Sequence, residues 1–180
     1  MNDHDAGKPI EADLDLPIRY MDRSRAYYLA LGCGNPYRWA QNRDVPFARL
    51  TRPLTGSRLV LITTAAPFNP DAGDQGPWAP YNAAAKFTRV YSMAVEPAPD
   101  LRISHVGYDR KHTSAEDVNS YFPLQRLKEA AAAGQVGEIN NRFYGVPSLR
   151  SQRLTTERDA PRILEMCRQD RVDAAILVAT

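Results

Sequence analysis

The sequence predicts an α/β fold in three layers, with helices flanking a mainly parallel sheet. Four aliphatic residues in a row, Leu59–Ile62, predict a strand that is covered on both faces. The predicted elements follow the order helix, strand, loop, strand, helix, helix, strand. This order is typical of parallel strands joined by crossover helices.

Three segments are predicted to be strands. Ser57–Thr64 is the clearest, because Gly56 and Pro67 bound a β-branched, aliphatic run. Leu101–Val106 alternates apolar and polar side chains, which indicates a strand covered on one face. The last segment, Arg171–Thr180, is predicted to be a buried strand, and its carboxyl end is where ligands usually gather in such sheets.

Three segments carry helix signals. Residues 17–32 place apolar residues at helical spacing between Pro17 and a terminating Gly32. Residues 123–134 combine proline at the first turn, alanines throughout and glycine at the exit. Residues 159–168 are predicted to form the third helix, with Pro161 in its first turn. The apolar stripe of this third helix consists of Ala160, Ile163, Leu164 and Cys167.

The connections between these elements are also informative. The loop at residues 65–80 holds four prolines and two glycines, and loops of this length are tolerated mainly near functional sites. Val136–Ile139 and Arg142–Val146 are predicted to be short extended pieces around a turn at Asn140–Asn141.

The domain organisation is predicted to be simple. Residues 1–16 carry five acidic side chains and few apolar ones, which predicts a flexible acidic leader. Residues 17–180 are predicted to form one α/β domain.

Composition excludes several function classes. The net charge is +2 without a run of basic residues, so nucleic-acid binding has no support. No stretch of 18 apolar residues and no signal peptide is visible, and the cytoplasm is the expected location. Cys33 and Cys167 are too few and too far apart for a disulfide framework or a cysteine-based metal site. No glycine-rich dinucleotide or phosphate-loop motif follows a strand.

Candidate site residues follow two of the predicted strands. Thr63 and Thr64 end the first strand and could hold a substrate carboxylate through hydroxyl and backbone N–H groups. The alternative is a pair of threonines selected for β propensity. Asn119 could brace the turn into the following helix.

The densest polar cluster is at residues 108–119, directly after the second strand. Histidine titrates near physiological pH, so His105 and His112 are candidate acid–base catalysts. Together with Asp109 they offer metal-ligand residue types, but their spacing matches no known signature and no metal is assigned. The alternative for all of these groups is hydrogen bonding to backbone and water.

An ordered set of segments resembles one family. The segments are Tyr37–Ala40, Asp44–Phe47, Ser57–Thr64, Asp100–His105, Tyr108–Arg110, Asp117–Asn119, Phe122–Leu127 and Val172–Leu177. In this order and spacing the chain resembles the selenoprotein B family of glycine, sarcosine and betaine reductases and the related proline reductase subunits. The likeness runs from about residue 17 to residue 180.

The resemblance implies a function. In that family a selenocysteine, or a cysteine in its place, follows the last matched strand and cleaves a carbon–nitrogen bond reductively, often with a pyruvoyl-bearing partner subunit. The substrate would be a small, amino-acid-like molecule. Thr63, Thr64, His105, Asp109, His112 and Asn119 would surround the nucleophile. No cofactor is assigned to this chain itself.

The resemblance also implies that the nucleophile lies just beyond Thr180. The chain is then expected to be the N-terminal half of a larger α/β fold, incomplete at its C-terminal edge and inactive alone. A stop-type selenocysteine codon read as a terminator would give this product, and a true short form would look the same. An exposed last strand would favour homo-oligomers. The alternative function is a non-catalytic subunit that binds a small ligand at the same strand ends.

Overall fold

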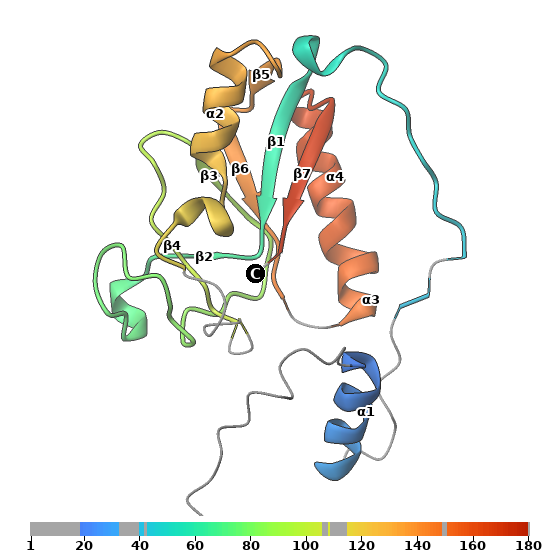
Figure 1. Ribbon diagram of the computed structural model, residues 1–180, viewed down its shortest axis with the longest axis vertical. Helices are drawn as coiled ribbons and strands as arrows, with labels where there is room; N and C mark the ends of the chain where they lie inside the picture. The colour runs from blue at the N-terminus through green and yellow to red at the C-terminus, as the bar shows by residue number, and fades with distance from the viewer. Residues whose placement is uncertain are drawn as a thin grey trace, which may run out of the picture. The chain divides into compact units, whose positions relative to one another are not determined.

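The computed structural model describes residues 19–32, 40–41, 43–105, 108, 115–148 and 151–179 (Figure 1). The chain divides into two compact units, Met1–Val45 and Pro46–Thr180. The predicted boundary between leader and domain, at residues 16 and 17, lies outside the described residues and stays a prediction.

The first unit contains helix α1 (Tyr20–Ala30), which confirms the first predicted helix. It ends as predicted, because Gly32 adopts a left-handed φ of 74° and donates its N–H to the carbonyl of Leu29 at 3.0 Å. Among the described residues, no helix is both long and apolar enough to cross a bilayer.

The second unit is organised around strand β1 (Arg58–Thr63). Strand β7 (Ala174–Val178) pairs with it in parallel from Leu59 to Thr63. Strands β5 (Glu138–Ile139) and β6 (Arg142–Gly145) also pair with β1 in parallel. Strand β7 lies along one edge of β1. Strands β5 and β6 therefore lie along the opposite edge of β1. Strand β3 (Tyr91–Ala94) adds to β6 in the antiparallel direction.

Strands β5 and β6 are one strand interrupted by a bulge. Leu59 and Ile62 of β1 pair with Ile139 and Tyr144, so three steps along β1 oppose five along its neighbour. The buried Asn140 holds this bulge by donating its N–H to Leu59 O at 2.7 Å. The bulge adds two residues to this strand. Because two is an even number, the side chains before and after the bulge that face inward stay on the same face of the sheet.

Helices cover both faces of the sheet, which confirms the predicted three-layer α/β fold. On one face, Leu124 and Leu127 of helix α2 (Leu124–Ala132) join the core cluster of Leu59 and Leu61. On the other face, helix α4 (Ala160–Gln169) contributes Met166 to a cluster with Val60 and Ile62. Figure 1 shows α2 and α4 on opposite sides of β1.

Helix α4 continues a shorter helical segment. Helix α3 (Gln152–Leu154) leads into a wide turn (Thr155–Asp159), across which the Ala160 N–H bonds the carbonyl of Thr155, five residues back. Pro161 lacks an N–H group and would clash with a carbonyl of a regular helix, and a wide turn next to it relieves both constraints.

The predicted apolar stripe of this helix is partly wrong. Ala160 is exposed and Leu164 is 50% exposed, whereas Asp159 and Met166 are buried. The inner face carries an aspartate held by an ion pair with Arg158 at 2.8 Å, so hydrophobicity alone does not reveal it.

The second predicted strand takes a different place from the one expected. Strand β4 (Leu101–Arg102) pairs in the antiparallel direction with β2 (Ala66–Pro67), in a separate two-stranded sheet. All of Leu101–Ser104 is buried, because Arg102 is ion-paired inside rather than directed to solvent. Strand β3 was not predicted at all.

Strand β7 is only half covered. Among the described strands, β7 pairs with β1 alone. Leu177 of β7 is 68% exposed, although it lies on the same face of the sheet as the part that α4 covers. Ala174, Ile176 and Val178 pack against the core cluster on the opposite face. The prediction of a strand is confirmed, but complete burial is wrong because β7 forms an edge of the described sheet.

Gly137 provides a test of how closely β5 approaches β1. A Cβ atom there would lie 2.4 Å from the carbonyl oxygen and 2.8 Å from the nitrogen of Ser57. Both are backbone atoms, so we expect Gly137→Ala to lower the free energy of unfolding by about 1–3 kcal/mol in urea denaturation. Gly56→Ala is the matched control, since its Cβ would meet only Arg52 Cδ at 4.0 Å. Equal stability of the two variants would contradict this packing.

Candidate functional site

Three parallel strands end at one edge of the sheet. Thr63 of β1 is in register with Gly145 of β6 and with Val178 of β7. Beyond the strands, Thr64 N–H donates to Val178 O at 3.3 Å, and Val146 N–H donates to Thr63 O at 2.8 Å. The arrows of β1, β6 and β7 point to this edge in Figure 1.

The connections that leave β1 and β6 go to opposite faces. The chain after β1 passes through β2, β3 and β4 before it reaches α2, which packs on the Leu59 face. The chain after β6 reaches α4, which packs on the Val60 face. Adjacent parallel strands with diverging connections create a crevice at their carboxyl ends, where ligands bind in open α/β sheets. The carboxyl edge at Thr63 and Gly145 is therefore the candidate site, and we refer to it as the candidate crevice.

The hydroxyl of Thr63 is occupied by its own loop. The side chain is buried, and Oγ1 donates to Tyr121 O at 3.3 Å while it accepts the N–H of Ala65 at 3.1 Å. Thr63 thus joins the end of β1 to the turn before α2. Thr64 is half-buried at the mouth of the same edge.

Asn119 braces the turn that Thr63 contacts. The short 3₁₀ turn Val118–Ser120 starts at Asp117, whose Oδ1 accepts the backbone N–H of Asn119 at 2.9 Å and its side-chain amide at 2.8 Å. These two hydrogen bonds hold the pKa of Asp117 below its usual value. The sequence prediction that Asn119 braces this turn agrees with these contacts.

His105 follows the buried segment of β4. It is half-buried, and its carbonyl accepts the N–H of Tyr108 at 3.2 Å. The Tyr108 ring packs 5.9 Å from the ring of Tyr81. Asp109 and His112, the other predicted residues of this segment, lie outside the described residues. Within the described part of the chain, no three His, Cys, Asp or Glu side chains are grouped so as to hold a metal ion.

Tyr91 and Gly145 belong to the edge and were not predicted. A Cβ atom on Gly145 would lie 1.8 Å from Cε1 of Tyr91, so only glycine fits against the tyrosine ring. The Tyr91 hydroxyl donates to Ala65 O at 2.6 Å, and burial raises its pKa. The available signal was a glycine inside an extended segment, which often marks a close approach of another group.

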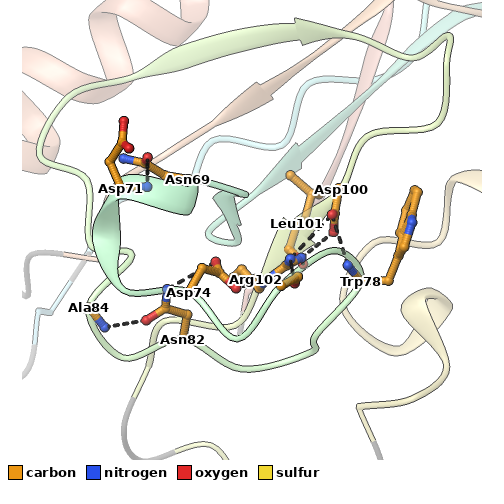
Figure 2. Close-up of polar contacts among 10 residues, drawn as sticks. Asn69, Asp71, Asp74, Trp78, Asn82, Ala84, Asp100, Leu101 and Arg102 are labelled. Atoms are coloured by element: carbon orange, nitrogen blue, oxygen red, sulfur yellow. Dashed lines mark hydrogen bonds and ion pairs between the residues drawn. The ribbon is translucent and has the colours of Figure 1, made fainter.

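A buried arginine on β4 organises the loop between β2 and β3 (Figure 2). Arg102 Nε donates to Asp74 at 3.0 Å, Nη1 donates to Asp100 and to Leu101 O, and Nη2 donates to Gly76 O at 2.5 Å and to Asp100 at 3.3 Å. All five N–H groups of the guanidinium are used. The ring of Phe68 lies 4.6 Å from the guanidinium carbon.

The carboxylates of this cluster hold further parts of the loop. Asp74 also accepts from Asn82 at 3.1 Å, and Asp100 accepts the N–H of Trp78 at 3.0 Å. Burial would raise the pKa of Asp74, but hydrogen bonds from Asn82 and Arg102 outweigh this and hold the pKa below its usual value. The cluster fixes the loop that leaves the candidate crevice.

A second polar cluster lies at the opposite edge, where the parallel strands begin. Asp170 accepts from Arg142 at 2.7 and 2.8 Å, from Tyr144 at 2.6 Å and from Asn140 at 2.9 Å. These bonds strongly lower its pKa, with Arg142 as the largest cause. They tie the end of α4 to the bulge. Nearby, burial raises the pKa of the Cys167 thiol, which favours the packing role predicted for it.

Comparison with known families identifies the larger unit. The family described as glycine/sarcosine/betaine reductase selenoprotein B matches residues 45–180, more than half of the chain. The match begins at Val45, the last residue of the first unit, and leaves out Tyr37–Ala40. No curated protein and no solved structure matches the chain.

The Arg102 cluster predicts a specific acid dependence of stability. The pKa of Asp74 is lower in the folded chain than its ordinary value of 3.8, so its contribution is complete above that pH and is lost as the pH falls through the folded pKa. We expect the free energy of unfolding to decrease over this acidic window, and to decrease less steeply in Asp74→Asn. Urea denaturation at a series of pH values measures both slopes. Parallel curves for the two proteins would contradict the assignment.

Proposed function

This chain belongs to the glycine/sarcosine/betaine reductase selenoprotein B family, and on that basis we propose that it helps to cleave a carbon–nitrogen bond reductively in a small, amino-acid-like substrate. The observation that carries the proposal is the shared carboxyl edge at which the parallel strands β1, β6 and β7 finish in register. Ligands of open α/β sheets bind at this position.

The family resemblance implies a selenol or thiol that supplies the nucleophile, and we place it directly after β7, beyond Thr180. Val178 pairs with Thr63, so a residue just past β7 would lie beside the crevice. An anionic selenolate or thiolate at a strand end is favoured where neighbouring backbone N–H groups point toward it. The 180-residue chain alone would therefore lack the activity.

The substrate carboxylate is assigned to the mouth of the crevice. Thr64 is half-buried there, and the hydroxyl of Thr63 donates to Tyr121 O and accepts the N–H of Ala65. We therefore assign Thr63 to positioning the Ala65 N–H and the turn at Tyr121. Thr64 is proposed for contact with the substrate because it is the first residue beyond β1 at this edge. Asn119 and Asp109 complete the proposed binding set.

The departing amine requires a proton when the carbon–nitrogen bond breaks. His105 and His112 are the proposed donors, because imidazole changes charge near physiological pH. His105 lies at the end of the segment that the buried Arg102 anchors. A partner subunit, which in the resembling reductases often carries a pyruvoyl group, would complete the enzyme in the cytoplasm.

The position of the nucleophile is tested on the protein from its native source. We expect the codon after Thr180 to be a stop-type selenocysteine codon or to lead into a cysteine-containing continuation, and the intact mass to exceed that of the 20.1 kDa chain. Sequencing of the transcript and whole-protein mass spectrometry provide both measurements. A true stop with a native mass of 20.1 kDa would refute the placement and favour the non-catalytic ligand-binding alternative.

The role of His105 is tested in the longer form. We expect His105→Gln to reduce turnover by at least about 100-fold, the lower range for loss of a general acid, without a matching loss of thermal stability. Arg126→Ala is the control, because this exposed arginine on α2 bonds only Glu129 in the described structure. Steady-state kinetics and thermal melting are compared for both. If activity and melting temperature fall together, His105 is structural.

A further inference from the structure

A pocket that the proposed reaction does not use lies between the start of β3 and the start of α4. Its volume is about 300 Å³, and it is lined by Arg89, Val90, Arg158, Asp159 and Arg162. Three arginines against one aspartate give these residues a net charge of +2. The size lies at the lower end of the range for small-ligand pockets.

One of the arginines is fixed in place. Arg158 Nε donates to Oδ1 of the buried Asp159 at 2.8 Å, and Nη2 donates to Asp159 Oδ2 at 3.3 Å and to the carbonyl of Thr88 at 2.8 Å. The carboxylate of Asp159 is therefore neutralised by its neighbour, and Arg158 keeps Nη1 for another acceptor. A guanidinium held in this way loses little side-chain entropy when it binds an anion.

The other two arginines retain hydrogen-bond donors. Arg89 makes no hydrogen bond or ion pair with any described residue, which leaves its whole guanidinium available. Arg162 uses Nη1 to bond Glu165 on the surface of α4 at 2.5 Å. The pocket thus presents more positively charged donors than its own carboxylate can satisfy.

We propose that this pocket is a binding site for a small oxyanion, a carboxylate or a phosphate group, with Arg89 as the principal ligand and Arg158 and Arg162 beside it. The planar guanidinium donates two parallel N–H groups to two oxygens of either anion, and such charge-assisted pairs are the strongest hydrogen bonds in proteins. Val90 supplies an apolar wall that lowers hydration of the bound group.

The arginine pocket and the turn that Thr63 contacts lie on opposite faces of the sheet, near the same strand edge, since Val146 N–H donates to Thr63 O at 2.8 Å. Val90 packs with Val146 and Ile163 in the core cluster on the α4 face. The turn at Tyr121, which Thr63 contacts, belongs to the cluster on the other face. Anion binding in the arginine pocket is measured on this chain directly, and the measurement does not require the proposed reductase activity.

The test is calorimetric titration of the chain with inorganic phosphate and, separately, with acetate. Ionic strength is kept constant with chloride, because screening weakens any exposed charge pair. We expect Arg89→Ala to raise the Kd of the bound anion at least about tenfold, which corresponds to about 1.4 kcal/mol, close to the lower limit for a hydrogen bond to a charged group. Binding of phosphate alone or of acetate alone would each support the site and identify the class of its ligand.

Arg162→Ala and Arg126→Ala form a matched pair for the same titration. Each arginine bonds a glutamate three residues later on an exposed helix face, but only Arg162 lines the pocket. We expect Arg162→Ala to weaken binding and Arg126→Ala to leave it unchanged, with melting curves confirming that both fold. No saturable binding of either anion, or equal losses in all three variants, would overturn the proposal.

Discussion

The structure depends on the burial of β1. Its residues Leu59 to Thr63 are all buried, with neighbours along both edges and a core cluster on each face. A strand in this position can accept only apolar side chains until its end, where the sheet stops and Thr63 turns its hydroxyl to the loop. The location of the candidate crevice follows from this single strand.

Long, strongly patterned elements could be predicted from the sequence for the same reason. The aliphatic run of β1 and the alanine-rich α2 carry their environment in their own residues. Strands β2, β3 and β4 are two to four residues long, and their positions are set by partners distant in the sequence. Local pattern contains little information about such pairing.

Buried polar residues are the second limit on sequence reasoning. Arg102 lies within an alternating segment that predicted an exposed arginine, and Asp159 lies on the inner face of a helix. Each is buried because a specific partner compensates for the loss of water, and that partner cannot be identified before the fold is known. The residues of the candidate site divide in the same way. Thr63 and Thr64 could be predicted because they end the aliphatic run of β1. Tyr91 and Gly145 could not, because their contact depends on the pairing of β3 with β6.

The arginines of this chain separate into two kinds by the same hydrogen-bond accounting. Arg102 is buried and all five of its N–H groups already have acceptors within its own loop, so it has no capacity for a ligand and acts as a structural residue. Arg89 has the same chemistry, but no described residue accepts from it, although it lines a pocket in which the carboxylate of Asp159 is already bonded to Arg158. Residue type and charge are identical in the two cases. The number of unsatisfied donors, together with an adjacent cavity, is what distinguishes an arginine that holds the fold from one that is available to hold an anion.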